Sequence, residues 1–569
     1  MEGSPIEGRD PTPSLAEDPA LGLDRRTKFE ILGAIMLGLF LGALDQTIVG
    51  TALPRIVTDL GGNDLYTWAV TIYLLTSTIT VPFYGKLSDL YGRRPLLMIG
   101  IGLFLAGSAL AGLSQEMWHL ILFRGIQGLG AGALFPISLA VIGDLFTPAE
   151  RGKYQGLFGA VFGLSALIGP GLGGFLTDTV SWHWVFYVNI PVGFISLYVI
   201  WRLLPTVKRT DASRDLDYLG AAVFTVAIGS LLVGLTNKQT GDWLDPEVGG
   251  LIGIGLLLSA VFLAIEARAK EPIVPLDLWR NRTYASSVVS TFFVSFGFFG
   301  AIIFLPRWFQ FVREVSATES GYQVLALLIG LISSSIAAGV IVSRTGRYKP
   351  VIMTGLAIMA VGLTLMTNLR TNTDIPVLWL WMFITGLGIG PTMSVFTIVV
   401  QNAVPFDKLG VATSNLTFFR QIGGSVGLAV VGTMFGTRLQ EELPRQLAAN
   451  GVPQQAASRF AGPESGALDQ LVGVGQDLGA VILGSIPPEA RPLVEPIIPN
   501  IVAGIHDAFS LAVAGTFQIG VVTTVIALAA AVVLRELPLR TSHGPGRAAE
   551  AAPAEHAAES ALRHAPAAD

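Results

Sequence analysis

The chain has 569 residues, of which 51% are hydrophobic and only 14% are charged, whereas an ordinary globular protein is about 25% charged. A soluble protein of this composition would lack the polar surface that it needs, so a soluble multidomain protein is excluded. The net charge of −5 provides no basic field for nucleic acid. The absence of cysteine excludes disulfides, thiolate nucleophiles and cysteine-ligated metals.

Apolar windows long enough to cross the bilayer recur along the chain, because about 20 residues of helix cross ~30 Å of hydrocarbon. There are fourteen, at about 29–50, 67–86, 95–113, 118–142, 155–177, 184–204, 218–236, 248–267, 284–306, 320–342, 351–369, 376–401, 410–435 and 507–534. An even number places both termini on one side. With the termini inside, the inner loops and flanks carry 22 lysines and arginines and the outer loops five. This bias predicts cytoplasmic termini.

Two inner loops, residues 85–95 and 339–350, share two glycines and an arginine at equivalent positions. Each lies between the second and third helix of a six-helix block, which predicts two similar bundles related by an axis along the membrane normal. The predicted divisions are a cytoplasmic tail 1–28, a first bundle 29–204, linker helices with their loops 205–283, a second bundle 284–534 that includes an outer insert 436–506, and a disordered cytoplasmic tail 535–569.

Five motifs, each at a fixed helix, resemble signatures of the major facilitator superfamily and, within it, of the 14-helix drug:proton antiporter family. They are residues 44–54, 85–95, 120–130, 163–174 and 182–193. The first motif departs from the family in Gly50 and Thr51, where Asn and Val are usual, and the last in His183, where Arg is usual. The resemblance implies an all-α polytopic membrane protein with the major facilitator fold, driven by a proton gradient, with no cofactor or metal and no enzymatic activity.

Asp45 and Arg124 lie inside the first and fourth predicted spans, in their outer halves. A charge within a membrane span is costly and usually functional, so we expect the two side chains to be neighbours. The resemblance implies that they couple transport to proton movement. The alternative is a static buried ion pair that only holds two helices together.

The turn that contains Gly85, Asp89, Gly92 and Arg93 is predicted to form a cytoplasmic latch. Its glycines allow close helix approach and positive φ. In the superfamily an acid on the same face pairs with the loop arginine, which implies an ion pair between Arg93 and Glu150. The alternative is a turn that carries only the charges of the inner face.

The fifth span contains Gly169, Pro170, Gly173 and Gly174, which we interpret as an antiporter hinge or a seal between bundles. Pro170 removes one backbone hydrogen bond, and glycines let a facing helix pack closely. A plain packing surface is the alternative. Arg420, inside the thirteenth span, is predicted to face the central cavity, where it pairs with an acid of the other bundle, contacts a substrate carbonyl or lipid phosphate, or bonds to backbone carbonyls.

Helices 13 and 14 are predicted to project beyond the outer membrane surface. No proline interrupts residues 410–443, a helix of about 51 Å at 1.5 Å per residue, and the run from Pro499 to Arg535 gives about 54 Å by the same rise. Between them, residues 467–486 are weakly amphipathic and suit the membrane surface or a partner.

The cavity-forming helices offer few fixed charges, which favours an apolar cargo. The outer insert resembles that of mycobacterial family members that export triacylglycerides with a periplasmic lipoprotein. The main prediction is therefore a monomeric, proton-coupled lipid exporter of the bacterial inner membrane, with a periplasmic lipoprotein acceptor as partner. The alternative is a proton:drug antiporter for amphipathic cations, which would favour a further intramembrane acid beyond Asp45, and no convincing one is found. A third class, a membrane enzyme, is disfavoured because the six histidines are scattered and cysteine is absent.

Overall fold

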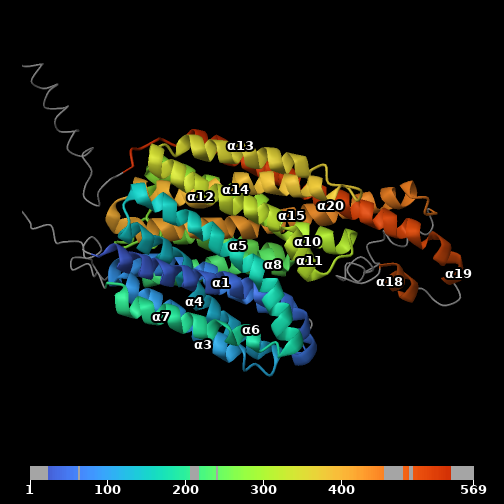
Figure 1. Ribbon diagram of the computed structural model, residues 1–569, viewed down its shortest axis with the longest axis horizontal. Helices are drawn as coiled ribbons and strands as arrows, with labels where there is room; N and C mark the ends of the chain where they lie inside the picture. The colour runs from blue at the N-terminus through green and yellow to red at the C-terminus, as the bar shows by residue number, and fades with distance from the viewer. Residues whose placement is uncertain are drawn as a thin grey trace, which may run out of the picture.

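The computed structural model describes residues 23–61, 65–205, 217–238, 241–453, 478–485 and 491–539. These ranges form helices joined by short turns and contain no strand, so the prediction of an all-α protein is confirmed. Most of the helices run side by side along the long axis of the molecule (Figure 1). Residues 1–22, 540–569 and most of the predicted amphipathic stretch 467–486 lie outside the described residues.

The first bundle contains six helical elements, the last of which is a pair of helices. They are α1 (Arg25–Leu60), α2 (Tyr66–Tyr91), α3 (Arg93–Ala111), α4 (Met117–Leu145), α5 (Pro148–Thr179) and the pair α6 (Trp184–Tyr187) and α7 (Asn189–Leu203). Helix α4 packs on α2 and α3, and α1 packs on α5 and α7. These helices occupy residues 25–203, and the predicted domain boundaries stay a prediction.

The described part of the second bundle contains nine helices, and a pair of linker helices joins the two bundles. Its helices are α10 (Arg282–Val312), α11 (Ala317–Gln323), α12 (Leu325–Thr345), α13 (Lys349–Met366), α14 (Ile375–Ala403), α15 (Leu409–Ala449), α18 (Leu478–Ser485), α19 (Arg491–Val494) and α20 (Ile498–Val532). The linker helices, α8 (Tyr218–Asn237) and α9 (Leu251–Glu266), pack on each other, and α8 also contacts α2 and α15.

Thirteen helices of the described residues are long and apolar enough to cross a membrane. The remaining predicted window forms α2, which has sufficient length but carries threonine, serine and tyrosine along it. Its hydroxyls are satisfied inside the helix: Thr76 donates to Ile72 O at 2.8 Å and Thr80 donates to Thr76 O at 2.8 Å. Such local bonds let a helix with polar residues lie in hydrocarbon. The count of fourteen spans and the side of the termini stay predictions.

Besides smaller contacts of α5 with α11 and α14 and of α4 with α15, the bundles meet along two main helix pairs, α5 with α12 and α2 with α15. Glycines permit both contacts. A Cβ atom on Gly152 would lie 2.3 Å from the carbonyl oxygen of Gly339, and one on Gly85 would lie 1.9 Å from the Ser414 hydroxyl. Backbone therefore touches backbone across the α5–α12 interface, which larger side chains would separate.

Helices α15 and α20 are longer than a bilayer requires. They contain 41 and 35 residues, or about 62 and 53 Å at 1.5 Å per residue. Figure 1 shows that both extend past the other helices at one end, beside α18 and α19. The prediction of two overlong helices is confirmed, and α15 continues through Pro444 to Ala449, because Leu443 and Leu447 are buried within the second bundle's core.

We expect Gly152→Ala to destabilise the protein by about 1–3 kcal/mol, the usual cost of overpacking a tight interface. The matched control is Gly174→Ala on the same helix, where an added Cβ has no atom within 4 Å. Thermal unfolding of the purified proteins in detergent measures the difference. Equal midpoints for the two variants would show that the α5–α12 contact does not constrain the fold.

Candidate functional site

Asp45 of α1 and Arg124 of α4 form an ion pair in the interior of the first bundle. Asp45 is 0% exposed and Arg124 is 2% exposed. Gln127, one turn beyond Arg124, joins them: its Nε2 donates to Asp45 Oδ1 at 2.7 Å, and its Oε1 accepts from Arg124 at 2.7 Å. The prediction that Asp45 and Arg124 are neighbours is confirmed, whereas their part in proton coupling stays a prediction.

Three further helices contribute to this buried network. Asn189 at the start of α7 donates to Asp45 Oδ1 at 3.0 Å, and Ser108 of α3 accepts from Gln127 at 2.7 Å. The ring of Tyr73, on α2, lies 4.2 Å from the centre of the Arg124 guanidinium, a distance typical of a cation–π contact. We call Asp45, Arg124, Gln127, Asn189, Ser108 and Tyr73 the charge network.

Sequence reasoning found only two members of the charge network. Gln127 and Asn189 both lie in motifs that carried the family resemblance, at 120–130 and 182–193, so a signal for them existed. Ser108 and Tyr73 lie in no motif, and only the packing of α3 and α2 on α4 brings them to the site.

At the end of the molecule that holds the α2–α3 turn, Arg93 pairs with two carboxylates. Its guanidinium contacts Asp89 at 2.5 Å and Asp144, near the end of α4, at 3.0 Å. Asp89 also accepts hydrogen bonds from the backbone N–H groups of Gly410 and Val411, at 3.0 and 2.8 Å. These amides open α15, and a helix N-terminus favours a negative charge. The turn therefore joins the first bundle to the second.

The predicted ion pair between Arg93 and Glu150 is wrong. Glu150 is the third residue of α5, where its carboxylate accepts from the Thr147 hydroxyl at 3.1 Å and the Thr147 backbone amide at 3.3 Å. This capping box satisfies the exposed amides of the helix start, and Asp144 supplies the acid that Arg93 needs. Gly92 has φ +95°, as its place in the turn requires.

A second set of hydrogen bonds crosses between the bundles near the same end. Gln401 of α14 donates to Leu139 O of α4 at 3.1 Å and to the Thr413 hydroxyl at 3.2 Å, and it accepts from Gln155 of α5 at 2.9 Å. We call this set, Gln401, Leu139, Thr413 and Gln155, the amide crossing. Together with the Asp89 bonds it closes the two bundles against each other at this end.

The predicted hinge segment of α5 packs against α1. A Cβ on Gly169 would lie 2.1 Å from the Thr47 hydroxyl, and one on Gly173 would lie 2.2 Å from the Thr51 hydroxyl. The Thr47 hydroxyl also donates to Ser165 O at 3.1 Å. These two glycines therefore permit a close contact within the first bundle.

Pro170 and Gly174 of the same segment have different surroundings. Pro170 faces Gly321 of α11 in the second bundle, whereas a Cβ on Gly174 would meet no atom within 4 Å. Helix α5 continues through Pro170 from Pro148 to Thr179. The segment thus contacts both bundles, and its bending during transport stays a prediction.

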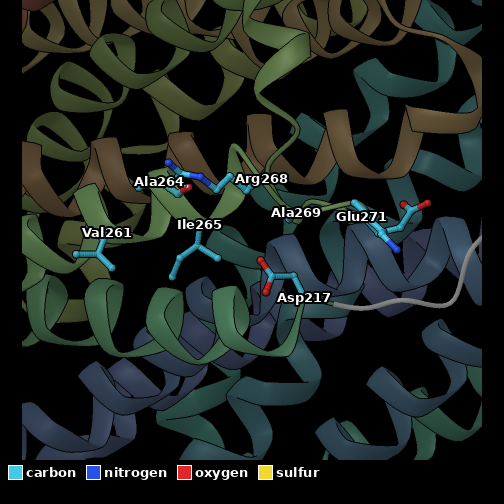
Figure 2. Close-up of a pocket in the computed structure, with 8 residues that line it drawn as sticks. Asp217, Val261, Ala264, Ile265, Arg268, Ala269 and Glu271 are labelled. Atoms are coloured by element: carbon cyan, nitrogen blue, oxygen red, sulfur yellow. Dashed lines mark hydrogen bonds between the residues drawn. The ribbon is translucent and has the colours of Figure 1, made fainter.

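A cavity of about 540 Å³ lies at the ends of the linker helices α8 and α9 (Figure 2). Its charged groups come from Asp217, Arg268, Lys270 and Glu271, and Ile265 forms part of its apolar wall. Glu271 forms an ion pair with Lys86, which is adjacent to Gly85 of the turn. No group of metal-ligating side chains occurs among the residues that the structure describes.

Comparison with known proteins places these features in a family. The family model described as Major Facilitator Superfamily matches residues 35–428 of this chain. A multidrug transporter protein, MdtP, of Bacillus subtilis is 41% identical over 77% of this chain and 81% of its own length. An uncharacterized MFS-type transporter of Mycobacterium tuberculosis is 36% identical over 95% of this chain and 74% of its own.

A solved structure supports the same fold. The proton:xylose symporter XylE superposes with a TM-score of 0.53 over 89% of this chain and 96% of its own, at 14% identity. At that identity the likeness concerns the fold alone.

We expect Asp144→Asn to open the closed end, because it removes a charged hydrogen bond to Arg93 of about 1.5–3 kcal/mol. Glu150→Gln, the matched control, leaves Arg93 paired. Since the chain has no cysteine, Lys153→Cys and Arg344→Cys, both exposed on the α5 and α12 surfaces, accept spin labels cleanly. Electron paramagnetic resonance should show longer distances for Asp144→Asn alone. Longer distances for Glu150→Gln alone would instead identify Glu150 as the partner of Arg93.

Proposed function

This chain belongs to the major facilitator superfamily and is a multi-pass membrane transporter rather than an enzyme, and we propose that it is a proton-coupled antiporter that exports amphipathic, drug-like molecules. The observation that carries this proposal is the charge network, in which a fully buried carboxylate is held by three donor side chains. A carboxylate inside a membrane protein suits a proton carrier.

The charge network supports proton coupling because its members can accommodate both states of Asp45. Ionised, Asp45 accepts from Arg124, Gln127 and Asn189. Protonated, it must donate to an acceptor. The Asn189 Oδ1 atom is enclosed and has no partner, so rotation of this amide presents that oxygen to the new hydroxyl. Release of Arg124 from a neutral Asp45 then loosens α4 against α1.

Alternating access follows if that loosening reaches the closed end. Arg124 lies on α4, the helix that also contributes Leu139 to the amide crossing and Asp144 to the Arg93 turn. A shift of α4 therefore acts on the contacts between the bundles. In this proposal, proton uptake at Asp45 favours separation of the bundles at that end, and cargo binding favours deprotonation.

Drug-like cargo is favoured over lipid by the relatives. Two Bacillus subtilis proteins that resemble this chain are named as multidrug transporters or multidrug resistance proteins, and neither name refers to lipid. The predicted alternative is therefore the better supported reading. We place the protein in a bacterial inner membrane with cytoplasmic termini, on the strength of its bacterial relatives and of the inner-loop arginines and lysines.

Lipid export with a periplasmic lipoprotein acceptor is the second candidate, and one observation favours it. Helices α15 and α20 extend past the rest of the molecule, as a path toward an acceptor would require. Lipid analysis of deletion cells, complemented by the intact protein, tests this candidate. Unchanged lipids together with altered dye efflux would exclude it.

We expect Asp45→Asn to abolish proton-driven transport and to leave cargo binding and substrate exchange intact, because the amide cannot carry a proton. Reconstituted vesicles with an imposed pH gradient measure uptake of a fluorescent drug, and exchange is measured without a gradient. Asp178→Asn, an exposed acid on α5, is the control and should resemble the wild type. Gradient-driven transport by Asp45→Asn would refute the proposed coupling.

A further inference from the structure

Arg420 is a charged side chain inside α15 that has no partner among the residues that the structure describes. Its guanidinium makes no hydrogen bond or ion pair with any described residue, and its Nη2 atom is closed off from solvent. By contrast, Asp45 and Arg124 neutralise each other. A cation within a membrane span is costly and normally finds an acceptor, so the vacant donors of Arg420 are available to an acceptor from outside the described residues.

Helix register places Arg420 toward the space between the bundles. It lies seven residues, or two turns, after Thr413, so both residues occupy one face of α15. Thr413 accepts from Gln401 in the amide crossing, which joins the two bundles. Arg420 is therefore about 10 Å deeper than that closure at 1.5 Å per residue. Gly424, one turn further, faces the ring of Phe299 on α10.

The first bundle carries two aromatic side chains close to the amide crossing. Phe135 lies one turn before Leu139, whose carbonyl oxygen accepts from Gln401, and its ring centroid is 4.9 Å from that of Phe162 on α5. Phe162 is 39% exposed, so part of its ring is accessible. We call Phe135 and Phe162 the aromatic wall, and helix register puts it on the same side of the amide crossing as Arg420.

The charge balance of this space disfavours cationic cargo. No described carboxylate lies within ion-pair distance of Arg420, so its charge is not compensated. In a poorly hydrated chamber an uncompensated positive charge repels a second cation and attracts an anion. An Arg guanidinium also bonds carboxylate and phosphate oxygens in a bidentate manner.

We propose that Arg420 is the head-group site for the cargo and that the transporter selects amphipathic aromatic molecules bearing a carboxylate, sulfonate or phosphate over amphipathic cations. This inference rests on the proposed export function and narrows its substrate class. The aromatic wall takes the apolar body of the cargo, and Arg420 takes its anionic oxygens.

The test uses three fluorescent probes with one aromatic body: pyrenebutyrate, its methyl ester and pyrenebutylammonium. Binding is measured at equilibrium to the full chain in phosphatidylcholine nanodiscs, with empty nanodiscs as the blank. The wild type should bind pyrenebutyrate at least tenfold more tightly than pyrenebutylammonium, since a charge-assisted bidentate pair has that strength. Arg420→Gln should remove this preference and leave the ester unchanged, and Arg420→Lys should restore part of it.

Arg438→Gln, on the same helix five turns away, is the matched control and should bind as the wild type does. Equal affinity of the wild type and Arg420→Gln for pyrenebutyrate would overturn the inference, as would tighter binding of the ammonium probe by the wild type. The binding assay needs no proton gradient, so it is independent of the coupling proposal. Selective binding without gradient-driven transport would refute only the coupling, and gradient-driven transport without selectivity would refute only the head-group site.

An anionic phospholipid presents the same chemistry as a free amphipathic anion, and a further arm separates the two sources. Phosphatidylglycerol is added to the nanodiscs, and pyrenebutyrate binding is measured again. Weaker binding in the wild type, but not in Arg420→Gln, would identify the lipid phosphate as the occupant of the head-group site. Unchanged binding in the wild type would identify a free amphiphile.

Discussion

The cost of a charge in hydrocarbon governs this structure. A charged side chain within a span is tolerated only where other groups replace its lost water. Asp45 of α1 and Arg124 of α4 meet this condition through amide and aromatic partners on α4, α7 and α2, and the Ser108 hydroxyl of α3 bonds to the amides in turn. Five helices of the first bundle are therefore tied to one buried pair. Protonation or deprotonation of Asp45 therefore affects more than the pair itself, because the same side chains also set how α4 packs on its neighbours.

The contacts between the bundles, by contrast, depend on backbone groups, neutral amides and the carboxylate of Asp89, whose bonds contribute about 1.5–3 kcal/mol. Gly152 and Gly339 bring α5 and α12 together, Gln401 links α14 to α4, and Asp89 binds the amides that open α15. Each of the neutral contacts is modest, because a neutral hydrogen bond contributes about 0.5–1.5 kcal/mol net. An interface of such bonds holds one state without making the other inaccessible, which is what a transporter that alternates between two states requires.

The sequence allowed the fold and the charged pair to be predicted because both have long-range signals. The length of the apolar windows follows from the thickness of the bilayer. The loop repeat and the motif around Arg124 are recognised by the spacing of their residues. The partner of Arg93 could not be predicted in this way, because the capping box with Thr147 holds the Glu150 carboxylate at the start of its own helix. No local pattern favours Asp144. The lack of a described partner for the Arg420 guanidinium could be learned only from the structure, because the sequence does not show which side chains surround it.

The linker helices restrain the relative motion of the bundles in a way that two bundles without a linker would not be restrained. Phe224 of α8 packs against Phe83 of α2 and Phe418 of α15, with ring centroids 5.6 and 5.3 Å apart. The loop after α9 pairs with Lys86 of the first bundle through Glu271. The same connection pairs with Lys408 at the start of α15 through Asp277, at 2.6 Å.

The linker is thus attached to both bundles on either side of the α2–α15 contact. Separation of α2 from α15 must stretch or release one of these attachments, whereas separation of α5 from α12 does not involve them, because neither linker helix packs against that pair. The two helix pairs that join the bundles are therefore not equivalent. The attachments favour a motion in which the α2–α15 side acts as the more restrained edge and the α5–α12 side moves further.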